Sequence, residues 1–491
     1  MNMIRRITNY VCFALILASL LSISPAPVEA GGNGDFPPPG TGDWIITTDT
    51  EVWNETILLK GNLTVEYGAT LTFRNVTLIM DSEVGGTTIE EFYHIEVKRG
   101  GAMKIFDWDG DNTTTGDASN ITLNNTNAYY WFWVRDGSNF TMRNSELHNC
   151  GGGPAYRGAA GLTINTNNAS IDRNLISKNY YGIVLNHSDA LISNNSISWN
   201  EHTGIFATWY SNGTIENNLI SWNNDSFGIH ITGVDNMKNY GSNPLVRNNR
   251  ITDTGCNIPG NPAVGIGIET GSNPLIKDTV VLRSTEDNVF VQGSTPTLIN
   301  VTLDGANFGI SSSSTEYIYV INSTIRNTNI DDLFIAGNPG SYFVLTNTTF
   351  NENKVDIDDN NSNLTVKWYL HVKAQDSLFS PISGANVRIK DNDNGTYDEN
   401  YSTNLNGYVR WIVLKEYLQT SSTKVDYTPH NITVDYTGLT FLNNPRDSTM
   451  DQSKTEVFTA TTTVPEFPSI VFPVTIILVV VIVLMKHKKR K

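Results

Sequence analysis

The chain reads IDRNLISKNYYGI at residues 171–183, ISNNSISWNEHTGI at residues 192–205 and IENNLISWNNDSFGI at residues 215–229. Each copy places two Ile-X-X-Asn units before a Gly-Ile pair, and the copies start 21 and 23 residues apart. A looser copy starts at Val246, and weaker copies start at Ile276, Leu298, Val320 and Leu345. A period in the low twenties that is built from short β-prone runs is typical of a stacked solenoid.

Within each copy the apolar side chains alternate along short runs, which indicates strands rather than helices. The pattern therefore predicts a parallel β-helix whose coils stack about 4.8 Å apart. We expect the repeated Asn residues, such as Asn174 and Asn195, to stand at turns in the left-handed conformation and to hydrogen-bond to one another in a ladder. The repeated Gly, such as Gly182, should allow a tight bend before the next strand.

The repeat organises most of the chain. We predict an all-β fold in which the solenoid covers residues 44–363 and a small β-sandwich covers residues 366–460, where evenly spaced strands alternate with turns. Residues 31–43 read as a Gly/Pro linker. This linker and the first coil should cap the open end of the solenoid, because an unpaired sheet edge invites aggregation.

Both ends of the chain predict export and anchoring. Residues 1–30 combine a basic start, an apolar run and a small-residue cleavage site after Ala30, as secretory signal peptides do. Residues 461–469 form a Thr/Pro stalk, residues 470–485 form one transmembrane helix, and the basic residues 486–491 should remain in the cytoplasm. We therefore expect a single-pass protein of the cell membrane whose ectodomain lies outside the cell.

Charge and cysteine usage narrow the class of protein. Acidic residues exceed basic ones by 16, which argues against nucleic acid as a partner because phosphate binding needs a basic patch. Cys150 and Cys256 should lie about four coils apart, too far for a disulfide unless loops bring them together. Asn-X-Ser/Thr sequons are frequent, and the glycosylation candidates include Asn54, Asn62, Asn75, Asn139, Asn212, Asn322 and Asn431.

Three resemblances add to this reading. The turn Pro381–Ala385, followed by Asn406–Tyr408, resembles the carboxypeptidase regulatory-like domain, which implies a spacer or binding module without a catalytic site. The segment Val464–Pro468 resembles PEF-type sorting signals of archaeal surface proteins, which implies that a sortase-like enzyme replaces the helix with a lipid; a retained helix is the alternative. Residues 44–460 resemble archaeal right-handed β-helix proteins of the NosD-like, carbohydrate-binding and sugar-hydrolase (CASH) type, which implies right-handed coils of pectate-lyase-like fold and a polysaccharide partner.

Stacking should bring equivalent residues of neighbouring coils into rows on the surface. Two positions after the repeated Gly, one outward row should hold Val184, Phe206, His230, Gly267 and Phe290. Trp209 and Tyr210 lie just beyond this row, and Trp199 and Trp222 share another register in which their rings can stack. Exposed aromatic rings with polar neighbours suit glycan binding, whereas coil stability is the alternative role for the tryptophan pair.

Catalytic candidates are fewer. A glycosidase needs two carboxylates a few ångströms apart, and the strands beside the row supply one, Glu269. Asp225 and Glu201 precede the repeated Gly and reach the row only if their loops carry them there. His230 completes the set, and the family resemblance implies that a lyase would use carboxylate-bound calcium and a basic residue.

Metal candidates lie mostly elsewhere. Acidic loops that space oxygen ligands two residues apart resemble calcium loops, with solvated turns as the alternative. The calcium candidates are Asp107, Asp109, Asp111, Asp391 and Asp393. His187, His202 and His230 fall on neighbouring coils and are candidates for a copper or zinc site.

Three functions fit this sequence. The first is a membrane-anchored surface protein that binds glycans or mediates adhesion without catalysis. The second is a polysaccharide lyase or glycoside hydrolase that uses Phe206, His230 and Glu269. The third is a structural protein of the cell envelope. The missing second carboxylate favours the first and third functions.

Overall fold

The computed structural model describes residues 30–82, 92–109, 116–125, 128–152, 161–224, 226–233, 241–255, 262–314, 317–338, 340–391 and 397–461. Every regular element in these ranges is a strand, and none of them contains a helix long and apolar enough to cross a membrane. The predicted signal peptide, transmembrane helix and basic tail lie outside the described residues. The chain divides into two compact units, the first of which holds residues up to Phe290 together with Leu303–Asn307.

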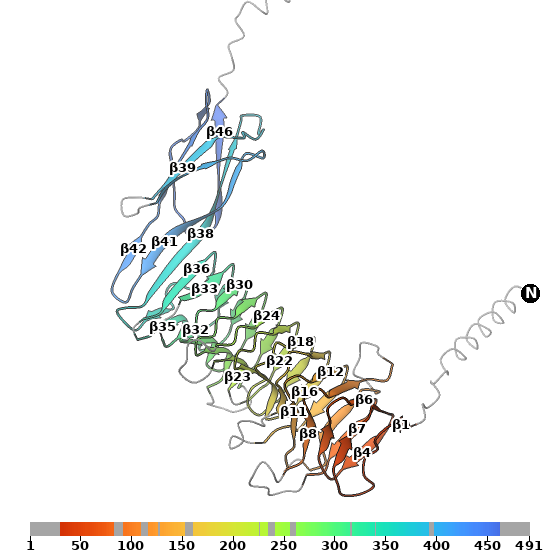
Figure 1. Cartoon of the computed structure of the whole chain (residues 1–491). Coiled ribbons are helices and arrows are strands. Elements are labelled where there is room, and N and C mark those ends of the chain that lie inside the picture. Colours follow the sequence, from red (N-terminus) through yellow and green to blue (C-terminus); the bar gives the residue numbers. More distant parts are fainter. Residues whose placement is uncertain are drawn as a thin grey trace, which may run out of the picture. The chain divides into compact units, whose positions relative to one another are not determined.

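The first unit consists of coils that each contribute a strand to three parallel sheets (Figure 1). Sheet A contains β3 (Thr50–Trp53), β6 (Thr70–Arg74), β9 (Ala102–Phe106), β12 (Asn139–Arg143), β15 (Ala169–Asp172), β18 (Leu191–Ser193), β21 (Thr214–Glu216), β24 (Leu245–Arg247) and β27 (Leu275–Lys277). Sheet B contains β4 (Thr56–Leu59), β7 (Thr77–Met80), β10 (Asn120–Leu123), β13 (Glu146–His148), β16 (Leu175–Ser177), β19 (Ser196–Ser198), β22 (Leu219–Ser221), β25 (Arg250–Thr252) and β28 (Val280–Leu282). Sheet C contains β2 (Trp44–Ile46), β5 (Leu63–Val65), β8 (His94–Val97), β11 (Trp131–Val134), β14 (Gly161–Ile164), β17 (Tyr181–Asn186), β20 (Ile205–Thr208), β23 (Phe227–Ile231) and β26 (Val264–Glu269). Strands β29 (Asp287–Gln292) and β31 (Thr302–Asp304) fall at the division between the units.

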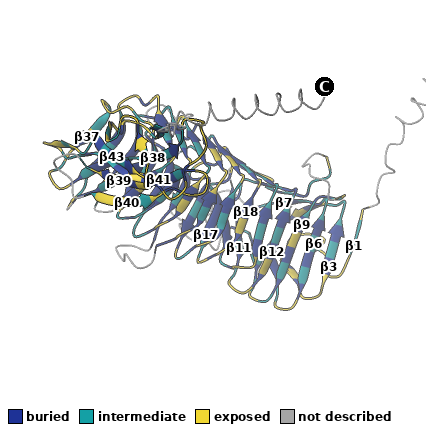
Figure 2. Cartoon of the chain, turned by 90° about the horizontal axis from the view of Figure 1, so that it is seen from above, coloured by how far each residue is buried: buried dark blue, intermediate teal, exposed yellow. Residues whose placement is uncertain are grey.

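The repeated phrase sets the register of the coils, as predicted. Ile171 pairs with Ile192, and Ile192 pairs with Ile215, in sheet A. These side chains are fully buried, and buried and exposed residues alternate along the strands (Figure 2). Each Ile therefore stacks on its equivalents one coil away, which gives the solenoid one continuous apolar core.

The repeated asparagines form two buried ladders. In the first, Nδ2 of Asn174 donates to Oδ1 of Asn195 at 3.0 Å, and Nδ2 of Asn195 donates to Oδ1 of Asn218 at 3.0 Å. The Oδ1 of Asn195 also accepts the backbone N–H of Asn174, and its Nδ2 donates to the carbonyl of Ile171. The second ladder joins Asn179, Asn200 and Asn223. Because the amides within the ladder have partners on both sides, their burial leaves no hydrogen bond unmade.

The left-handed residue of each turn precedes the ladder Asn. Arg173, Asn194 and Asn217 have φ angles of 57°, 57° and 56°. The expectation that the repeated Asn itself adopts this conformation is wrong, because its side chain points into the ladder and the preceding residue makes the turn. Trp199 and Trp222, with φ angles of 59° and 57°, occupy the equivalent position before the second ladder.

The repeated glycines allow close stacking rather than a bend. A Cβ on Gly182 would lie 2.4 Å from the carbonyl oxygen of Gly204, and a Cβ on Gly204 would lie 2.6 Å from that of Gly228. None of these three residues has a left-handed φ. The expectation of a tight bend is therefore corrected: the neighbouring coil occupies the space that a side chain would need.

An antiparallel strand covers the first coil. Strand β1 (Gly31–Asn33) pairs with β3. The carboxylate of Asp35 accepts the backbone N–H groups of Thr47 and Thr48 at 2.6 and 3.0 Å, and these bonds hold the pKa of Asp35 below its usual value. The Gly/Pro stretch thus protects the edge of sheet A, as a capped solenoid requires.

The second unit begins with further coils and ends in a sandwich. Its coil strands are β30 (Thr297–Ile299), β32 (Phe308–Ser312), β33 (Tyr317–Ile321), β34 (Thr324–Arg326), β35 (Asp331–Ile335), β36 (Tyr342–Thr346) and β37 (Val355–Ile357). One sandwich sheet contains β38 (Asn363–Gln375), β41 (Tyr408–Gln419), β42 (Lys424–Asp426), β44 (Thr440–Phe441) and β46 (Lys454–Thr461). The other contains β39 (Asn386–Lys390), β40 (Asp398–Ser402), β43 (His430–Asp435) and β45 (Arg446–Ser448).

Strand β38 belongs to both parts of the second unit. Its first residues pair in parallel with β36 of the last coils, and its later residues pair with β41 and β46 of the sandwich. The predicted boundary at residues 363–366 therefore falls inside a single strand. Leu370 on β38 contributes to the buried sandwich core together with Val387, Val434 and Phe458.

Replacing a ladder asparagine should destabilise the solenoid. Asn195→Ala removes four hydrogen bonds from buried groups of Asn174, Asn218 and Ile171, at a cost of about 3 kcal/mol. We expect the melting temperature, followed by circular dichroism, to fall by roughly 5–10 °C. Asn139→Ala, at an exposed position on β12, is the control and should change it by no more than about 1 °C. Equal shifts for the two variants would contradict the importance of the ladder.

Candidate functional site

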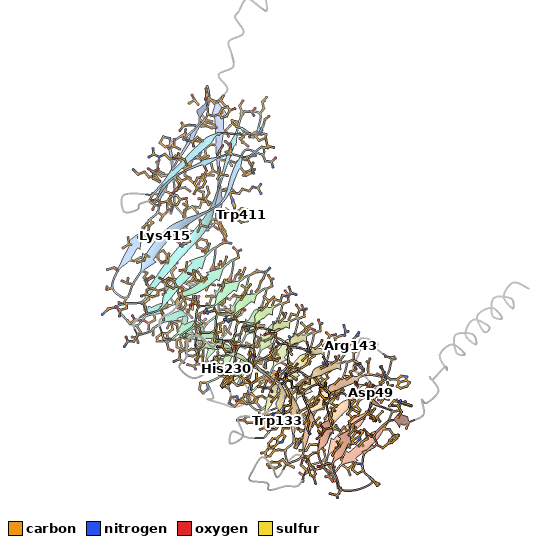
Figure 3. All side chains as sticks on the ribbon, viewed as in Figure 1. Asp49, Trp133, Arg143, His230, Trp411 and Lys415 are labelled. Atoms are coloured by element: carbon orange, nitrogen blue, oxygen red, sulfur yellow. The ribbon has the colours of Figure 1, made fainter. Side chains whose placement is uncertain are left out.

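A small cleft opens on sheet C of the first unit. It has a volume of about 330 Å³ and is lined by Tyr180, Tyr181, His202, Phe206, Ser226, Phe227 and His230. Figure 3 marks His230 on this part of the solenoid. Four of these seven side chains, Tyr180, Tyr181, Phe206 and Phe227, provide carbocyclic rings, and the other three, His202, Ser226 and His230, provide polar atoms.

 Four carbocyclic rings and three polar side chains therefore share one hollow.

The cleft follows the predicted outward row. Val184 pairs with Phe206, Phe206 with His230, and His230 with Gly267, so four of the five predicted members stand in register. The fifth, Phe290, is partly exposed on β29 and does not line the cleft.

The rings of the cleft stack along the row. The ring centroids of Tyr181 and Phe206 are 5.6 Å apart, and those of Phe206 and His230 are 5.0 Å apart. The ring of Phe227 stacks on His230 at 4.1 Å. It takes the space left at Gly267, where a Cβ would lie 2.2 Å from the Phe227 ring. The absence of a side chain at this point of the row therefore widens the aromatic surface.

One carboxylate contacts a residue of the cleft without lining the cleft itself. Oε2 of Glu269 lies 3.1 Å from Nε2 of His230, and both side chains are about four-fifths buried, with exposures of 23% and 16%. This pair can hold a proton or bind a hydroxyl group. Burial raises the pKa of Glu201, but Glu201 is not among the residues that line the cleft. Asp225 lies outside the described residues, so the described part of the chain shows one carboxylate here rather than two.

The other aromatic candidates lie at turns. The rings of Trp199 and Trp222 stack at 5.4 Å with an interplanar angle of 8°, as their shared register predicts. Trp209 is half exposed, and Tyr210 packs near the ring of His187 at 6.0 Å. None of these five residues lines the cleft.

Sequence reasoning missed several residues of this face. Tyr181 and Phe227 directly precede the repeated Gly, so their shared position in the repeat could have predicted that they lie on the same face. Trp133 was missed as well. It pairs with Thr163, which pairs with Val184, so Trp133 belongs to the same row as Phe206. The Arg135 guanidinium lies 4.1 Å from the Trp133 ring centroid.

The metal candidates are only partly brought together. Asp107 and Asp109 lie with Asp117, so that one oxygen of each carboxylate is within 4.8 Å of the others, whereas Asp111 lies outside the described residues. Burial, followed by the charges of Asp117 and Asp109, raises the pKa of Asp107, although Asn144 donates a hydrogen bond to it.

The remaining metal candidates form no such group in the described ranges. Asp391 lies 2.7 Å from Nδ1 of the buried His430, and Asp393 lies outside the described residues. His202 and His230 both line the cleft, but His187 lies beside Tyr210. The predicted three-histidine metal site is therefore not formed among these residues.

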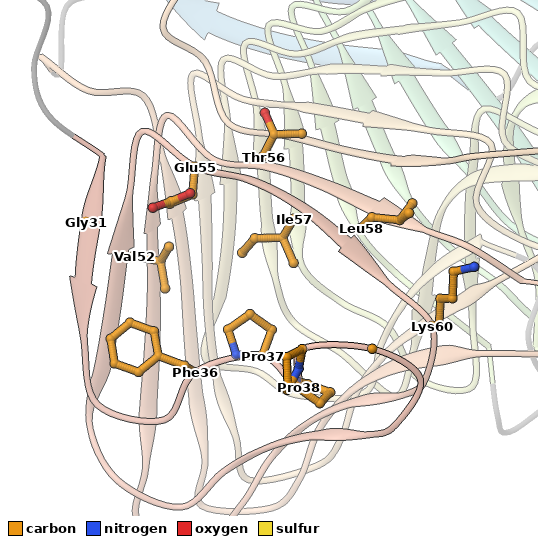
Figure 4. Close-up of a pocket in the computed structure, with 12 residues that line it drawn as sticks. Gly31, Phe36, Pro37, Pro38, Val52, Glu55, Thr56, Ile57, Leu58 and Lys60 are labelled. Carbon is orange, nitrogen blue, oxygen red and sulfur yellow. The ribbon is translucent and has the colours of Figure 1, made fainter.

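A second hollow of about 530 Å³ lies under the N-terminal cap (Figure 4). Phe36, Pro37 and Pro38 form one side, and Val52 and Ile57 form the other. Its surface is largely apolar and lies between the cap and the first coil, so it belongs to the cover of the solenoid end.

The cysteine and the sequons sit in different surroundings. Cys150 is buried and free, and burial raises the pKa of its thiol far above the usual value, while Cys256 lies outside the described residues. Of the glycosylation candidates, Asn139, Asn212 and Asn322 are exposed. The other four, Asn54, Asn62, Asn75 and Asn431, are partly buried.

Residues 160–278 match the family model described as the right handed beta helix region. A search of curated proteins finds no match. Among solved structures, the periplasmic alginate epimerase AlgG aligns with 65% of this chain and 84% of its own, at 10% identity and a TM-score of 0.48. The A-module of the Azotobacter vinelandii mannuronan C-5 epimerase AlgE6 aligns with 66% of this chain and 90% of its own, at 13% identity and a TM-score of 0.41. The GH87 α-1,3-glucanase of Streptomyces thermodiastaticus strain HF3-3 aligns with 63% of this chain and 64% of its own, at 12% identity and a TM-score of 0.33.

Removing the Asp107 charge should stabilise the protein at neutral pH. The raised pKa of Asp107 means that folding disfavours its ionised form, so stability is lost as the pH rises through that pKa. Without added calcium, Asp107→Asn should raise the melting temperature by about 1–3 °C at neutral pH. The gain should vanish well below pH 3.8, where the acid is protonated in both the folded and the unfolded state.

The same measurement with added calcium tests whether Asp107, Asp109 and Asp117 bind this ion. If they bind calcium, the ion should raise the melting temperature of the parent chain, and Asp107→Asn should abolish that rise. Stabilisation of both chains by calcium to the same degree would exclude a site at Asp107.

Proposed function

We propose that this chain is a surface-displayed protein that binds a neutral glycan in the cleft around Phe206 and His230. The observation that carries this proposal is the stack of Tyr181, Phe206 and His230, widened by Phe227. The apolar C–H face of a sugar packs on an aromatic ring, and hydroxyl groups need polar partners at the margin of the ring. His202, Ser226 and the His230–Glu269 pair supply such partners.

The charge of the cleft favours a neutral ligand. No Lys or Arg is present among the residues that line it, and Glu269 lies against His230. A polyanionic sugar would therefore meet a carboxylate without a compensating cation in the cleft. Because Trp133 stands in the same row, a linear glycan can follow the row across neighbouring coils.

A catalytic function is the second candidate. It is favoured by the hydrogen-bond distance between Glu269 and His230, which lines the aromatic cleft. Such a pair can transfer a proton to or from a bound sugar, as a lyase or hydrolase requires. Within the described residues one carboxylate, Glu269, contacts the cleft through His230, and the lack of a second one there is the reason why we place binding first.

The proposal includes display at the cell surface. The supporting feature is the apolar run at residues 470–485 followed by basic residues, which would hold the chain in a membrane with the solenoid outside. The sandwich would act as the spacer that the carboxypeptidase regulatory-like resemblance implies. Replacement of the helix by a lipid after Val464–Pro468 is the alternative form of the anchor.

Affinity electrophoresis of the full chain tests the binding proposal. Gels would contain neutral glucans or mannans, or acidic alginate or pectin. We expect retardation by a neutral polysaccharide, weakened at least about tenfold by Phe206→Ala because the stacking ring is lost. Tyr67→Ala, which removes an 81% exposed ring from another turn of the solenoid, is the matched control. No retardation by any neutral polysaccharide would refute the proposal.

The same chains distinguish catalysis from binding. Each polysaccharide would be incubated with the protein and assayed for new reducing ends and unsaturated products. The binding proposal predicts no product. Product formed by the parent chain and lost in Glu269→Gln would establish the enzyme instead.

A further inference from the structure

Four segments meet at one end of the sandwich in the second unit. They are the loop after β38, the turn before β41, strand β44 with the residues on either side of it, and the end of β46. Gln375 pairs with Thr459, and Lys373 pairs with Tyr408, so the ends of β38, β41 and β46 lie together (Figure 1). Phe441 pairs with Ala460, which places β44 at the same end.

Large apolar side chains project from these segments. Leu378 and Phe379 on the loop are 80% and 74% exposed, and Leu405 on the turn is 86% exposed. Leu442, which follows β44, is 53% exposed. We call these four residues the apolar tip. Each is exposed although the sandwich has a buried apolar core of its own, so the exposure is a property of the loops.

The loops hold these side chains outward. Asp376 accepts the backbone N–H groups of Leu378 and Ser380, each at 2.8 Å. Phe379 has a φ angle of 65°, a left-handed conformation that is uncommon for a bulky residue and that the capped loop enforces. Strain of this kind collects at functional sites, because the surrounding structure has to maintain it.

The turn that carries Leu405 is fixed in the same way. Oδ1 of Asn404 accepts the backbone N–H groups of Asn406 and Tyr408 at 2.9 and 3.1 Å. Leu405 is therefore held at the surface by a closed turn. Ordering these apolar groups before they meet a partner lowers the entropic cost of binding.

The tip is also poor in charge. The segments 375–385, 402–408, 435–443 and 459–461 contain two charged residues, Asp376 and Asp435, and no Lys or Arg. Asp376 is engaged with its own loop. An apolar surface with so few charges suits a hydrocarbon environment better than it suits an acidic or basic partner.

The position of the tip in the chain identifies its occupant. Strand β46 ends at Thr461 in the tip, and eight residues separate Thr461 from the apolar run that starts at Ile470. Eight residues span at most about 29 Å, so a membrane that holds this run lies close to the tip. We infer that Leu378, Phe379, Leu405 and Leu442 insert into the surface of the lipid bilayer that holds the chain. This inference rests on the proposed anchor and adds a second contact with the same membrane.

The test uses the full chain in phosphatidylcholine vesicles, with Cys12 and Cys256 replaced by Ser. Cys150 is buried and does not compete for label. An environment-sensitive fluorophore is attached at Leu405→Cys, or at Ser422→Cys in the exposed turn beyond the other end of β41 as the control. Emission and quenching by spin-labelled lipid are then measured.

We expect the label at position 405 to shift to shorter wavelength and to be quenched by the lipid, whereas the label at position 422 shows neither effect. High salt should not change this result, because the tip carries no basic residue. Adding Leu378→Ser and Phe379→Ser should lower the fraction of inserted label at least about tenfold, while flotation with the vesicles persists.

Three failures are distinguishable. Chains that do not float with vesicles would refute the anchor itself. Chains that float but show equal, unquenched labels at positions 405 and 422 would refute membrane contact by the tip and leave the anchor standing. A blue shift at position 405 without quenching by lipid would overturn the inference in favour of a protein contact.

Discussion

The hydrogen bond between neighbouring coils is the constraint on which the rest of the structure depends. Strands that pair in parallel lie about 4.8 Å apart, and every buried amide has to find its partner at that distance. Asn195 meets this condition with four bonds at once. The ladder fixes the distance between neighbouring coils. At this distance the space beside the repeated glycines is too small for a Cβ, so these positions require glycine.

The same constraint builds the cleft. Phe206 and His230 occupy equivalent positions on adjacent coils, so their rings stand 5.0 Å apart without any loop to arrange them. A platform built on a sheet loses little freedom when a ligand binds, because its rings are already in place. Glu269 joins it from the next strand and not from a flexible loop.

The sequence predicted what the repeat controls and missed what it does not control. Period and alternation were sufficient to predict the pairing of Ile171 with Ile192, and the row that joins Phe206 and His230, because equivalent positions must stack. The ring of Phe227 was missed, since its place depends on the empty position at Gly267 in the neighbouring coil.

Irregular segments were harder to predict for the same reason. Asp117 joins Asp107 and Asp109 although it comes several residues later in the chain, and no spacing rule brings it there. The left-handed turn was placed one residue too late, because Asn favours that conformation in isolation but its side chain is bound in the ladder here. Tertiary hydrogen bonding outweighed the local preference.

Strand β38 has a mechanical consequence. Thirteen residues run without interruption from Asn363, beside the last coils, to Gln375 in the sandwich. A pulling force applied along this strand loads its hydrogen bonds with β36, β41 and β46 together and parallel to the strand, so that they resist sliding as a group. A flexible linker at this point would stretch first, whereas a shared strand passes tension directly from the coils to the sandwich.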